Sequence, residues 1–298
     1  MKKLIILIII CLIPLTGCVI EIDDDLGVKI NDKNFNVNID GLNKVEIGDT
    51  RTIEEEFEVK GQKELEVRLD VSGADLSISK TEDNLFKGII ETNIKNLKPK
   101  IELKDNRIII DDNFKYNGLG KYENNWNLKF TNNIPLKLDI DSNASDNGFD
   151  FTGMKISKLD IDTNAASTDI NFNEKNEEDL DKIKLDINAG DLDIFDIGNA
   201  NASDINVDVN AGSVDIDFGD KVFKDTEVSI EANASSITID VPEDVGISIE
   251  KENMLSSLSY NSSEFDKVNG RYISKNYDKA KYKIEIELEG GVSSFDIK

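Results

Sequence analysis

The stretch Ile183-Lys-Leu-Asp-Ile-Asn188-Ala-Gly190 decides the fold, because every second residue of its first half is apolar. Such alternation predicts a β-strand with one face buried and the other exposed to solvent. The Asn-Ala-Gly that follows predicts a tight turn, since asparagine tolerates left-handed backbone and small neighbours let the chain bend. A second alternating strand follows the turn. The residues predicted to face inward are Ile183, Leu185, Ile187, Leu192 and Ile194.

Five copies of this pattern occur, with turn asparagines separated by 21, 24, 22 and 23 residues, and divergent copies occupy 67–74 and 284–291. One short unit cannot bury its inner face by itself, so neighbouring units must stack about 4.8 Å apart. We therefore predict an all-β fold, a β-solenoid of stacked short-strand coils of about 22 residues, with a less regular β N-terminal part. An antiparallel sandwich of hairpins is the alternative. The side chains predicted to form a structural turn ladder are Asn143, Asn164, Asn188, Asn210 and Asn233.

The N-terminus has the pattern of an export signal. Two lysines precede an almost unbroken apolar run from Leu4 to Leu15, which is typical of a secretory signal peptide. The run is too short for a transmembrane helix, which needs about 20 residues. The ending Leu15-Thr-Gly-Cys18 resembles the lipobox of bacterial lipoproteins. This resemblance implies cleavage before Cys18, acylation of its thiol, and lipid anchoring on the extracytoplasmic face of the bacterial cell membrane. An ordinary cleaved signal is the alternative.

Composition excludes several kinds of activity. The chain has 60 acidic and 35 basic residues, a formal net charge of −25, and binding to nucleic acid requires clustered Lys and Arg instead. It contains no histidine, which excludes Ser-His-Asp and Cys-His catalysis and histidine-ligated zinc. Cys11 lies in the signal and Cys18 is the expected acylation site, so we expect no disulfide in the mature chain. We also expect no catalytic residue and no cofactor.

Alignment of the copies brings acidic residues to one outward position. Carboxylates stacked about 4.8 Å apart repel one another, so they either attract cations or have raised pKa values. Calcium favours oxygen-rich surfaces, although no D-x-D-x-D-G loop occurs. Weak calcium binding and a solvated acidic face both remain open. The predicted members of this acidic ladder are Asp70, Asp141, Asp162, Asp186, Asp208, Glu231 and Glu287.

Three features lie outside the regular copies. Trp126 is expected to pack in the core or to cap the stack, with a sugar-stacking platform as the alternative. Residues 101–110 predict a β-hairpin around an Asp105-Asn106 turn. The aromatic-rich segment 260–282 is expected to cover the open end of the stack, because uncovered strand edges tend to associate. A partner-binding edge is the alternative for this segment.

The run Trp126-Asn-Leu-Lys-Phe-Thr-Asn-Asn-Ile-Pro135, followed by the repeated turns, resembles the bacterial toastrack domain. Ser72-Gly-Ala-Asp-Leu-Ser-Ile78 and the ending from Tyr282 to Phe295 share this resemblance, which covers residues 55–298. Family members include proposed adhesins and the soluble part of LiaF-type proteins, which respond to cell-envelope stress. The chain differs in having Asn-Ala-Gly/Ser turns where the family often has Gly-Ala-Gly. The family motifs are structural turns, so the resemblance implies no catalytic residue.

The predicted function is a membrane-anchored extracytoplasmic lipoprotein whose toastrack-like domain binds or senses at the envelope without catalysis. The alternatives are an adhesin-like module that contacts glycan or protein, and a β-helical carbohydrate-active enzyme. The expected partners are the lipid bilayer, through acylated Cys18, and an envelope protein or glycan. The predicted segments are a lipoprotein signal peptide (1–17), lipid anchor, spacer and entry strands (18–54), an N-terminal β region (55–135), regular β-solenoid repeats (136–241), and a C-terminal β region with cap (242–298).

Overall fold

The described part of the chain folds mainly into β-strands, which confirms the predicted all-β class. Within the residues described here, the one helical element is a short 3-10 turn, η1 (Ile197–Ala200). No helix in this part of the chain is long and apolar enough to cross a membrane. The predicted signal peptide and Cys18 lie outside the described residues. The computed structural model describes residues 20–22, 27–30, 33–36, 43–113, 116–117, 122–252 and 256–298.

Two small sheets are formed by strands near the N-terminus and by one later strand. At the start of the predicted anchor and spacer segment, Ile20, Glu21 and Ile22 form a paired strand. The first sheet has the antiparallel order β1 (Ile20–Ile22), β2 (Gly27–Ile30) and β3 (Lys33–Asn36). The second pairs β4 (Asn43–Lys44) with β11 (Tyr116–Asn117) in parallel.

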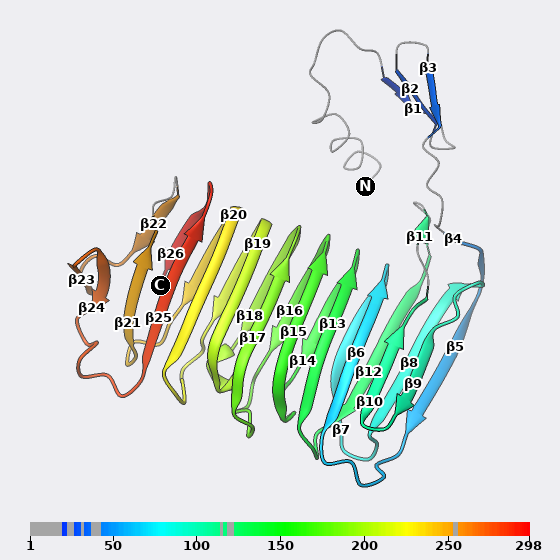
Figure 1. Ribbon diagram of the computed structural model, residues 1–298, viewed down its shortest axis with the longest axis horizontal. Coiled ribbons are helices and arrows are strands. Elements are labelled where there is room, and N and C mark those ends of the chain that lie inside the picture. Colours follow the sequence, from blue (N-terminus) through cyan, green and yellow to red (C-terminus); the bar gives the residue numbers. More distant parts are fainter. Residues whose placement is uncertain are drawn as a thin grey trace.

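The main body consists of two long sheets that face each other and extend along the longest axis of the molecule (Figure 1). Each passage of the chain gives a strand to sheet A and then one to sheet B, and successive passages pair in parallel, as stacked coils require. The middle of sheet A contains β6 (Leu65–Ser72), β13 (Leu136–Asn143), β15 (Ile156–Asn164), β17 (Leu180–Ile187), the first halves of β19 (Ala202–Asp217) and β20 (Thr226–Asp240), and β25 (Lys283–Gly290). The middle of sheet B contains β7 (Asp75–Thr81), β14 (Asp146–Asp150), β16 (Ala166–Asn171), β18 (Gly190–Phe195), the second halves of β19 and β20, and β26 (Ser294–Ile297).

The order of the coils in space differs from the order in the chain at both ends of the stack. The outer side of the first coil, β6–β7, pairs with strands that come later in the chain, β10 (Arg107–Asp111) and β12 (Asn124–Thr131). The last coil, β25–β26, lies between β20 and the earlier strands β21 (Gly246–Lys251) and β22 (Ser257–Tyr260), which form the outer end of the stack. The strands that cover the N-terminal end are β10 and β9 (Lys100–Lys104) in sheet A, and β12, β8 (Phe86–Ile94) and β5 (Ile47–Phe57) in sheet B. Those at the C-terminal end are β21, β24 (Arg271–Ser274) and β23 (Phe265–Val268) in sheet A, and β22 in sheet B.

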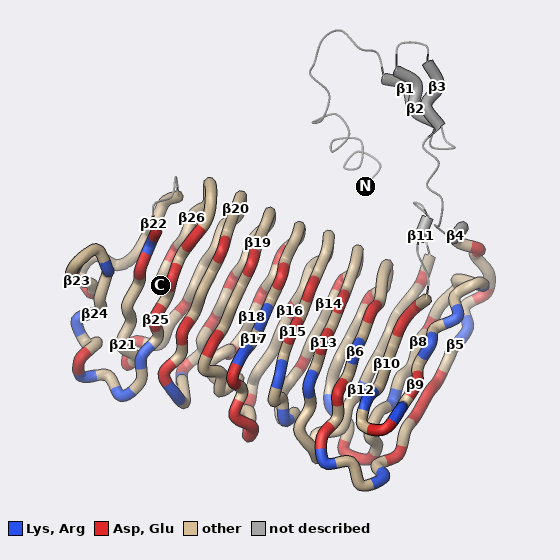
Figure 2. Tube along the Cα trace, in the orientation of Figure 1, with Lys and Arg blue, Asp and Glu red and all other residues tan. Residues whose placement is uncertain are grey.

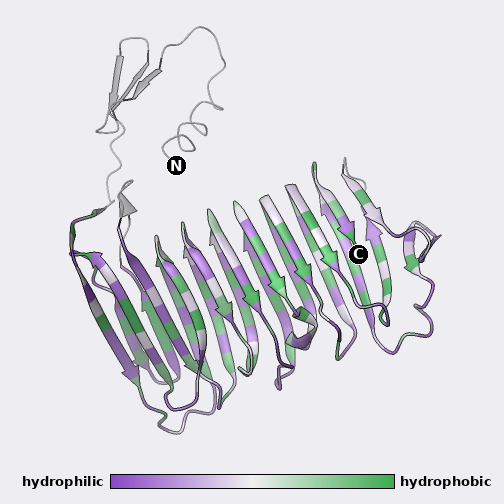
Figure 3. Ribbon diagram, turned by 180° about the vertical axis from the view of Figure 1, so that it is seen from behind, coloured by the Kyte–Doolittle hydropathy of each residue, from purple (hydrophilic) through white to green (hydrophobic). Residues whose placement is uncertain are grey.

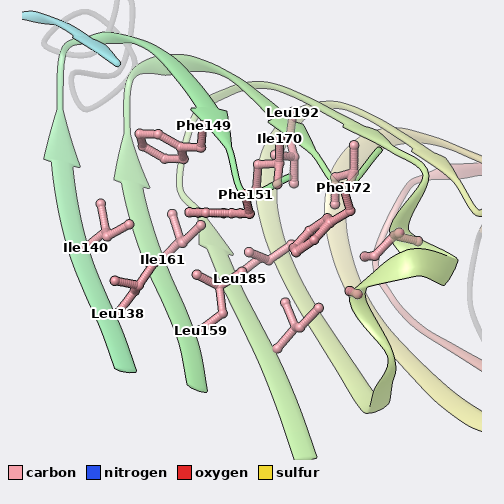
Figure 4. Close-up of a cluster of buried hydrophobic side chains, with 14 of the residues drawn as sticks. Leu138, Ile140, Phe149, Phe151, Leu159, Ile161, Ile170, Phe172, Leu185 and Leu192 are labelled. Atoms are coloured by element: carbon pink, nitrogen blue, oxygen red, sulfur yellow. The ribbon is translucent and has the colours of Figure 1, made fainter. Parts of the chain in front are cut away.

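Apolar side chains from both sheets fill the interior of the stack. Figure 3 shows hydrophobic and hydrophilic residues alternating along the strands, and Figure 4 shows the inward side chains meeting between the sheets. The rings of Phe149, Phe151 and Phe172 follow one another with centroid separations of 6.1 and 5.4 Å. The inward assignments are confirmed, because each side chain is at most 1% exposed: Ile183, Leu185, Ile187, Leu192 and Ile194.

Trp126 belongs to this core. Its side chain is 1% exposed, and its Nε1 donates a hydrogen bond of 2.8 Å to Oδ1 of Asn124. The prediction of a packing role is therefore confirmed, and the alternative of a sugar-stacking platform is wrong. The predicted hairpin is also present, because β9 and β10 pair in antiparallel fashion around Asp105, whose φ is 56°.

The corners between the two sheets have two different backbone conformations. Upstream, the turn residues Gly73, Ala144 and Ala165 have left-handed φ values of 58°, 51° and 53°. Downstream, β19 and β20 continue through their corners without a break. A Cβ placed on Gly190 or on Gly212 would lie 1.8 Å from the carbonyl oxygen of the preceding coil. The corners at Gly190 and Gly212 therefore need glycine for the close approach of stacked backbones, whereas Ser235 takes the equivalent place in β20.

Candidate binding surfaces

Six of the seven residues of the acidic ladder lie opposite one another on sheet A. Each pairs in parallel register with the equivalent residue of the next coil, so the carboxylates project from one face at successive strands. Figure 2 shows the acidic residues recurring from strand to strand across the stack. The register order is Asp70, Asp141, Asp162, Asp186, Asp208 and Glu231.

The assignment of Glu287 to the ladder is wrong, since it pairs with Ser229 while Glu289 stands opposite Glu231. The sequence pattern misled because Gly290 occupies the last inward position of this coil, opposite Ala232. Glycine has no side chain, so the apolar alternation ends two residues early. The ladder also extends to Asp111, which pairs with Asp70.

Burial and mutual repulsion make three of the ladder carboxyls harder to ionise. Burial is the main cause that raises the pKa of Asp141, followed by its carboxylate neighbours, beginning with Asp139. Burial also raises the pKa of Asp162 and Asp208, and Asp186 adds to both effects. The Lys184 ammonium donates a hydrogen bond to Asp186, and this bond raises the pKa of the lysine. Asp141, Asp162 and Asp208 therefore hold protons more readily than free carboxylates do.

A hollow of about 320 Å³ follows the ladder over the middle coils. Asp162, Asp186, Asp208 and Glu231 line it together with turn asparagines, so it presents carboxylate and amide oxygens. Among the described residues, no group of three or more acidic side chains is arranged to hold a metal ion. Weak calcium binding here stays a prediction.

The turn asparagines form hydrogen bonds between coils in two groups, one upstream and one downstream. Asn164 Nδ2 donates to Asn143 Oδ1 over 2.9 Å. Asn210 donates to Asn188 over 2.9 Å, and Asn233 donates to Asn210 over 3.0 Å. These amides are engaged in holding adjacent corners together, which is a structural role.

Sheet B carries a second acidic row that sequence reasoning missed. Asp169, Asp193 and Asp215 pair in register on adjacent strands. Burial raises the pKa of Asp193, with further contributions from Asp215 and then Asp169. The sequence signal that could have predicted this row is the aspartate that recurs between two inward residues after three successive turns.

The C-terminal end of the stack carries aromatic side chains and a hollow of about 620 Å³. Tyr260 packs against Phe265 and Tyr272, with ring centroids 5.8 and 4.7 Å apart. Val245 and Ile247 contribute apolar walls to the hollow. The aromatic segment thus lies at the end of the stack, where a cap was expected.

A stack of parallel coils with a filled core and charged outer faces defines a β-repeat domain that can make contacts through its surfaces. Residues 42–190, half of the chain, match the family model described as the N-terminal domain of toast_rack, DUF2154. Residues 190–297 match the model described as cell wall-active antibiotics response LiaF, C-terminal. The chain belongs to the toast_rack family, which confirms the resemblance seen in its sequence motifs.

Solved structures with similarity to the chain come from several bacteria. A proposed cell adhesion protein from Clostridium sporogenes is 21% identical, with 84% of this chain and 99% of that chain covered and a TM-score of 0.44. A proposed adhesin from Parabacteroides merdae is 10% identical, with 86% and 98% covered and a TM-score of 0.36. A proposed lipid binding protein from Parabacteroides distasonis is 10% identical, with 85% and 99% covered and a TM-score of 0.26. No curated protein matches the sequence significantly.

Proposed function

We propose that this chain is an exported lipoprotein, acylated at Cys18, whose toastrack domain is a non-catalytic binding or sensing module of the bacterial cell envelope. The observation that carries the proposal is the match of residues 190–297 to a family described by its response to cell wall-active antibiotics. The lipobox-like ending Leu15-Thr-Gly-Cys18 supports an anchored location for the module.

The shape of the domain supports recognition through its surface. Apolar side chains occupy the space between the two sheets from the first coil to the last. A ligand must therefore contact the outer faces, the corners or the ends of the stack. Such surfaces suit a macromolecular partner better than a small substrate, which normally needs an enclosing pocket.

The anchor is tested by removing the thiol group of Cys18. We expect the chain to fractionate with membranes and to incorporate labelled palmitate, and Cys18→Ala to abolish both. Cys11→Ala, which changes a cysteine inside the predicted signal, is the matched control and should leave both unchanged. Equal membrane recovery of Cys18→Ala would mean that the apolar segment itself holds the chain.

The envelope role is tested in cells that lack the protein. Exposure to cell wall-active antibiotics should reveal a changed minimum inhibitory concentration or a changed stress-reporter response. Expression of the intact chain should restore the wild-type response. Complementation by Cys18→Ala should fail if anchoring matters. An unchanged response in the deletion strain would contradict the sensing role.

An adhesin-like role is the second candidate, favoured by the long polar outer faces of both sheets. The purified domain applied to a glycan array should bind a defined glycan class if this role is correct. A turnover screen on the same glycans covers the remaining alternative, a carbohydrate-active enzyme, for which we expect no product.

A further inference from the structure

One segment at the C-terminal end of the stack contains more basic than acidic residues, unlike the regular coils. The coils at 136–241 contain eight lysines and no arginine against 25 acidic residues. The segment 265–283, which we call the basic cap, contains six basic and two acidic residues. The cap comprises β23, β24 and the loop that leads to β25, and Figure 2 shows its basic residues at the C-terminal end. A chain of net charge −25 therefore carries a local positive surface.

Most lysines of the coils form ion pairs with carboxylates, whereas those of the basic cap do not. Within the described part of the chain, Arg271 is the one cap residue in an ion pair, with Glu250 and Glu285. The five cap lysines have no carboxylate partner there, so their charges are available to another molecule: Lys267, Lys275, Lys279, Lys281 and Lys283. Six of the eight coil lysines form ion pairs: Lys137, Lys155, Lys158, Lys182, Lys184 and Lys224.

Tyrosine rings hold several of these ammonium groups in place. Lys267 lies 4.6 Å from the ring centroid of Tyr272, and Lys281 lies 4.5 Å from that of Tyr282. Such cation–π contacts restrict the lysines while leaving their charge in contact with solvent. Tyrosine is enriched at protein interfaces, and side chains that are already ordered lose less freedom on binding.

We propose that the basic cap of one molecule docks on the acidic ladder of a second copy of this chain. The ladder hollow is lined by four carboxylates, and Lys184 makes an ion pair with Asp186 among them. Both complementary surfaces therefore occur on this chain. Figure 1 places the cap at the end of the stack and the strands of the hollow along its body. The contact would join two different surfaces, so each molecule could accept one copy and donate to another.

Self-association should depend on salt because the net charges repel over long distances, while the cap and the ladder attract each other over short distances. At 0.01 M salt the screening length is about 30 Å, so the whole net charge of each molecule repels the other. At 0.15 M it falls to about 8 Å, and the nearby cap and ladder charges dominate. At 1 M it is about 3 Å and the local attraction is lost as well. Self-association should therefore be strongest at intermediate salt.

Sedimentation velocity of the full chain, carrying Cys18→Ser to exclude an acyl contribution, tests the proposal. K279E/K281E should weaken self-association at 0.15 M salt by about tenfold or more, which corresponds to about 1.4 kcal/mol. K98E/K104E is the matched control, because it makes the same charge change at the opposite end of the stack, and it should retain association. D162N/D208N should lose association through the ladder.

Mixing the cap variant with the ladder variant tests directly whether the cap docks on the ladder. Each keeps the surface that the other lacks, so an equimolar mixture of K279E/K281E and D162N/D208N should form heterodimers more readily than either variant associates by itself. Thermal unfolding of each variant checks that it is folded. A wild-type chain that is monomeric at every salt concentration, an equal loss in K98E/K104E, or a mixture that stays monomeric would each overturn the proposal.

Vesicles test the competing occupant of the basic cap. Phosphatidylglycerol vesicles carry anionic headgroups, and phosphatidylcholine vesicles are the neutral control. A Cys18→Ser chain that stays monomeric but sediments with the anionic vesicles, and loses this in K279E/K281E, would overturn docking on a second copy in favour of a membrane surface. Equal recovery with both vesicle types and clear self-association would support the second copy.

Discussion

The coils before and after Gly190 share one sequence signature but turn their corners differently. Upstream, Ala144 and Ala165 adopt left-handed φ values near 50° and the strands are interrupted. Downstream, β19 and β20 run straight through the corner, and Gly190 and Gly212 lie directly against the backbone of the preceding coil. The two family models also meet at residue 190. A common Asn-Ala-small motif therefore fixes where the chain turns without fixing how it turns.

The difference shows which interactions the corners have in common. A left-handed alanine costs about 1–2 kcal/mol relative to ordinary backbone, so upstream corners need compensation. The N–H of Ala144 donates to the carbonyl of Asn164 over 2.8 Å, and the asparagine side chains of the same two coils are hydrogen bonded. Downstream corners keep the asparagine contacts and avoid the left-handed alanine. Stacked amides and buried inward residues are therefore the shared elements.

The largest expected effect concerns the interior, which should behave alike in both halves. Ile187→Ala removes a side chain that is 1% exposed, and we expect a loss of about 2–5 kcal/mol in the free energy of unfolding. Asp186→Ala, one residue earlier and facing outward, should change it by about 0.5 kcal/mol or less. Urea unfolding followed by circular dichroism measures both. Reversed sensitivities would show that the strand register is wrong.

The second prediction separates the two kinds of corner. Gly212→Ala would place a Cβ 1.8 Å from the carbonyl oxygen of Gly190, and we expect a loss of about 2–3 kcal/mol from the backbone shift it forces. Ala165→Gly makes the opposite exchange at a left-handed residue. Relief of its φ strain is offset by the greater flexibility of unfolded glycine, so the net change should stay within about 1 kcal/mol. Similar losses in both variants would mean that the corners are equivalent.

Much of the fold could be predicted because alternation and turn chemistry are local signals. Leu185 and Leu192 were assigned inward from period two by itself, and both are buried. The parallel alignment of Asp162 with Asp186 follows from aligning repeats by their asparagines. Only the position of each residue relative to its own turn was needed for these inferences.

Features that depend on which coil lies next to which could not be predicted. The apolar alternation of the sequence does not indicate that β25 lies between β20 and β21, since any strand with this pattern can pair in parallel with any other. Glu287 was misplaced because Gly290 interrupts the apolar pattern at an inward position. The basic cap was recognised as a terminal aromatic segment, but the pairing state of its lysines depends on distances between elements.

The third prediction tests the element that the two halves share. Asn210→Ala removes hydrogen bonds to Asn188 and to Asn233, and we expect a loss of about 1–2 kcal/mol. Asn164→Ala removes the bond to Asn143 and a longer bond of 3.3 Å to the partly exposed Asp162, and it should cost about 1 kcal/mol. Differential scanning calorimetry of the two variants gives the comparison. An unchanged melting temperature for Asn210→Ala would remove the amide contacts from the forces that hold the corners.

The smallest expected effect is the pH dependence of stability caused by the acidic ladder. The pKa values of Asp141, Asp162 and Asp208 are raised above 3.8 in the folded chain, chiefly by burial. The folded state then binds more protons than the unfolded state in the window above 3.8, so stability rises as pH falls from about 7 towards 5. It is lost again as pH rises through the folded pKa values. Because Asp141 and Asp162 are only partly buried and Asp208 is exposed, screening should limit the total change to about 1 kcal/mol.

Asparagine at two ladder positions identifies the source of this pH dependence. D162N/D208N removes one carboxyl from each half of the stack, so its melting temperature should vary less between pH 5 and 7 than that of the wild type. Added sodium chloride should raise the wild-type melting temperature at pH 7 by screening the same repulsion. Calcium at specific sites would add a saturable increase that magnesium does not match. A wild-type melting temperature that falls steadily from pH 7 to 5 would instead mean that ion pairs such as Lys184 with Asp186 outweigh the repulsion, because protonation would then remove more attraction than it relieves.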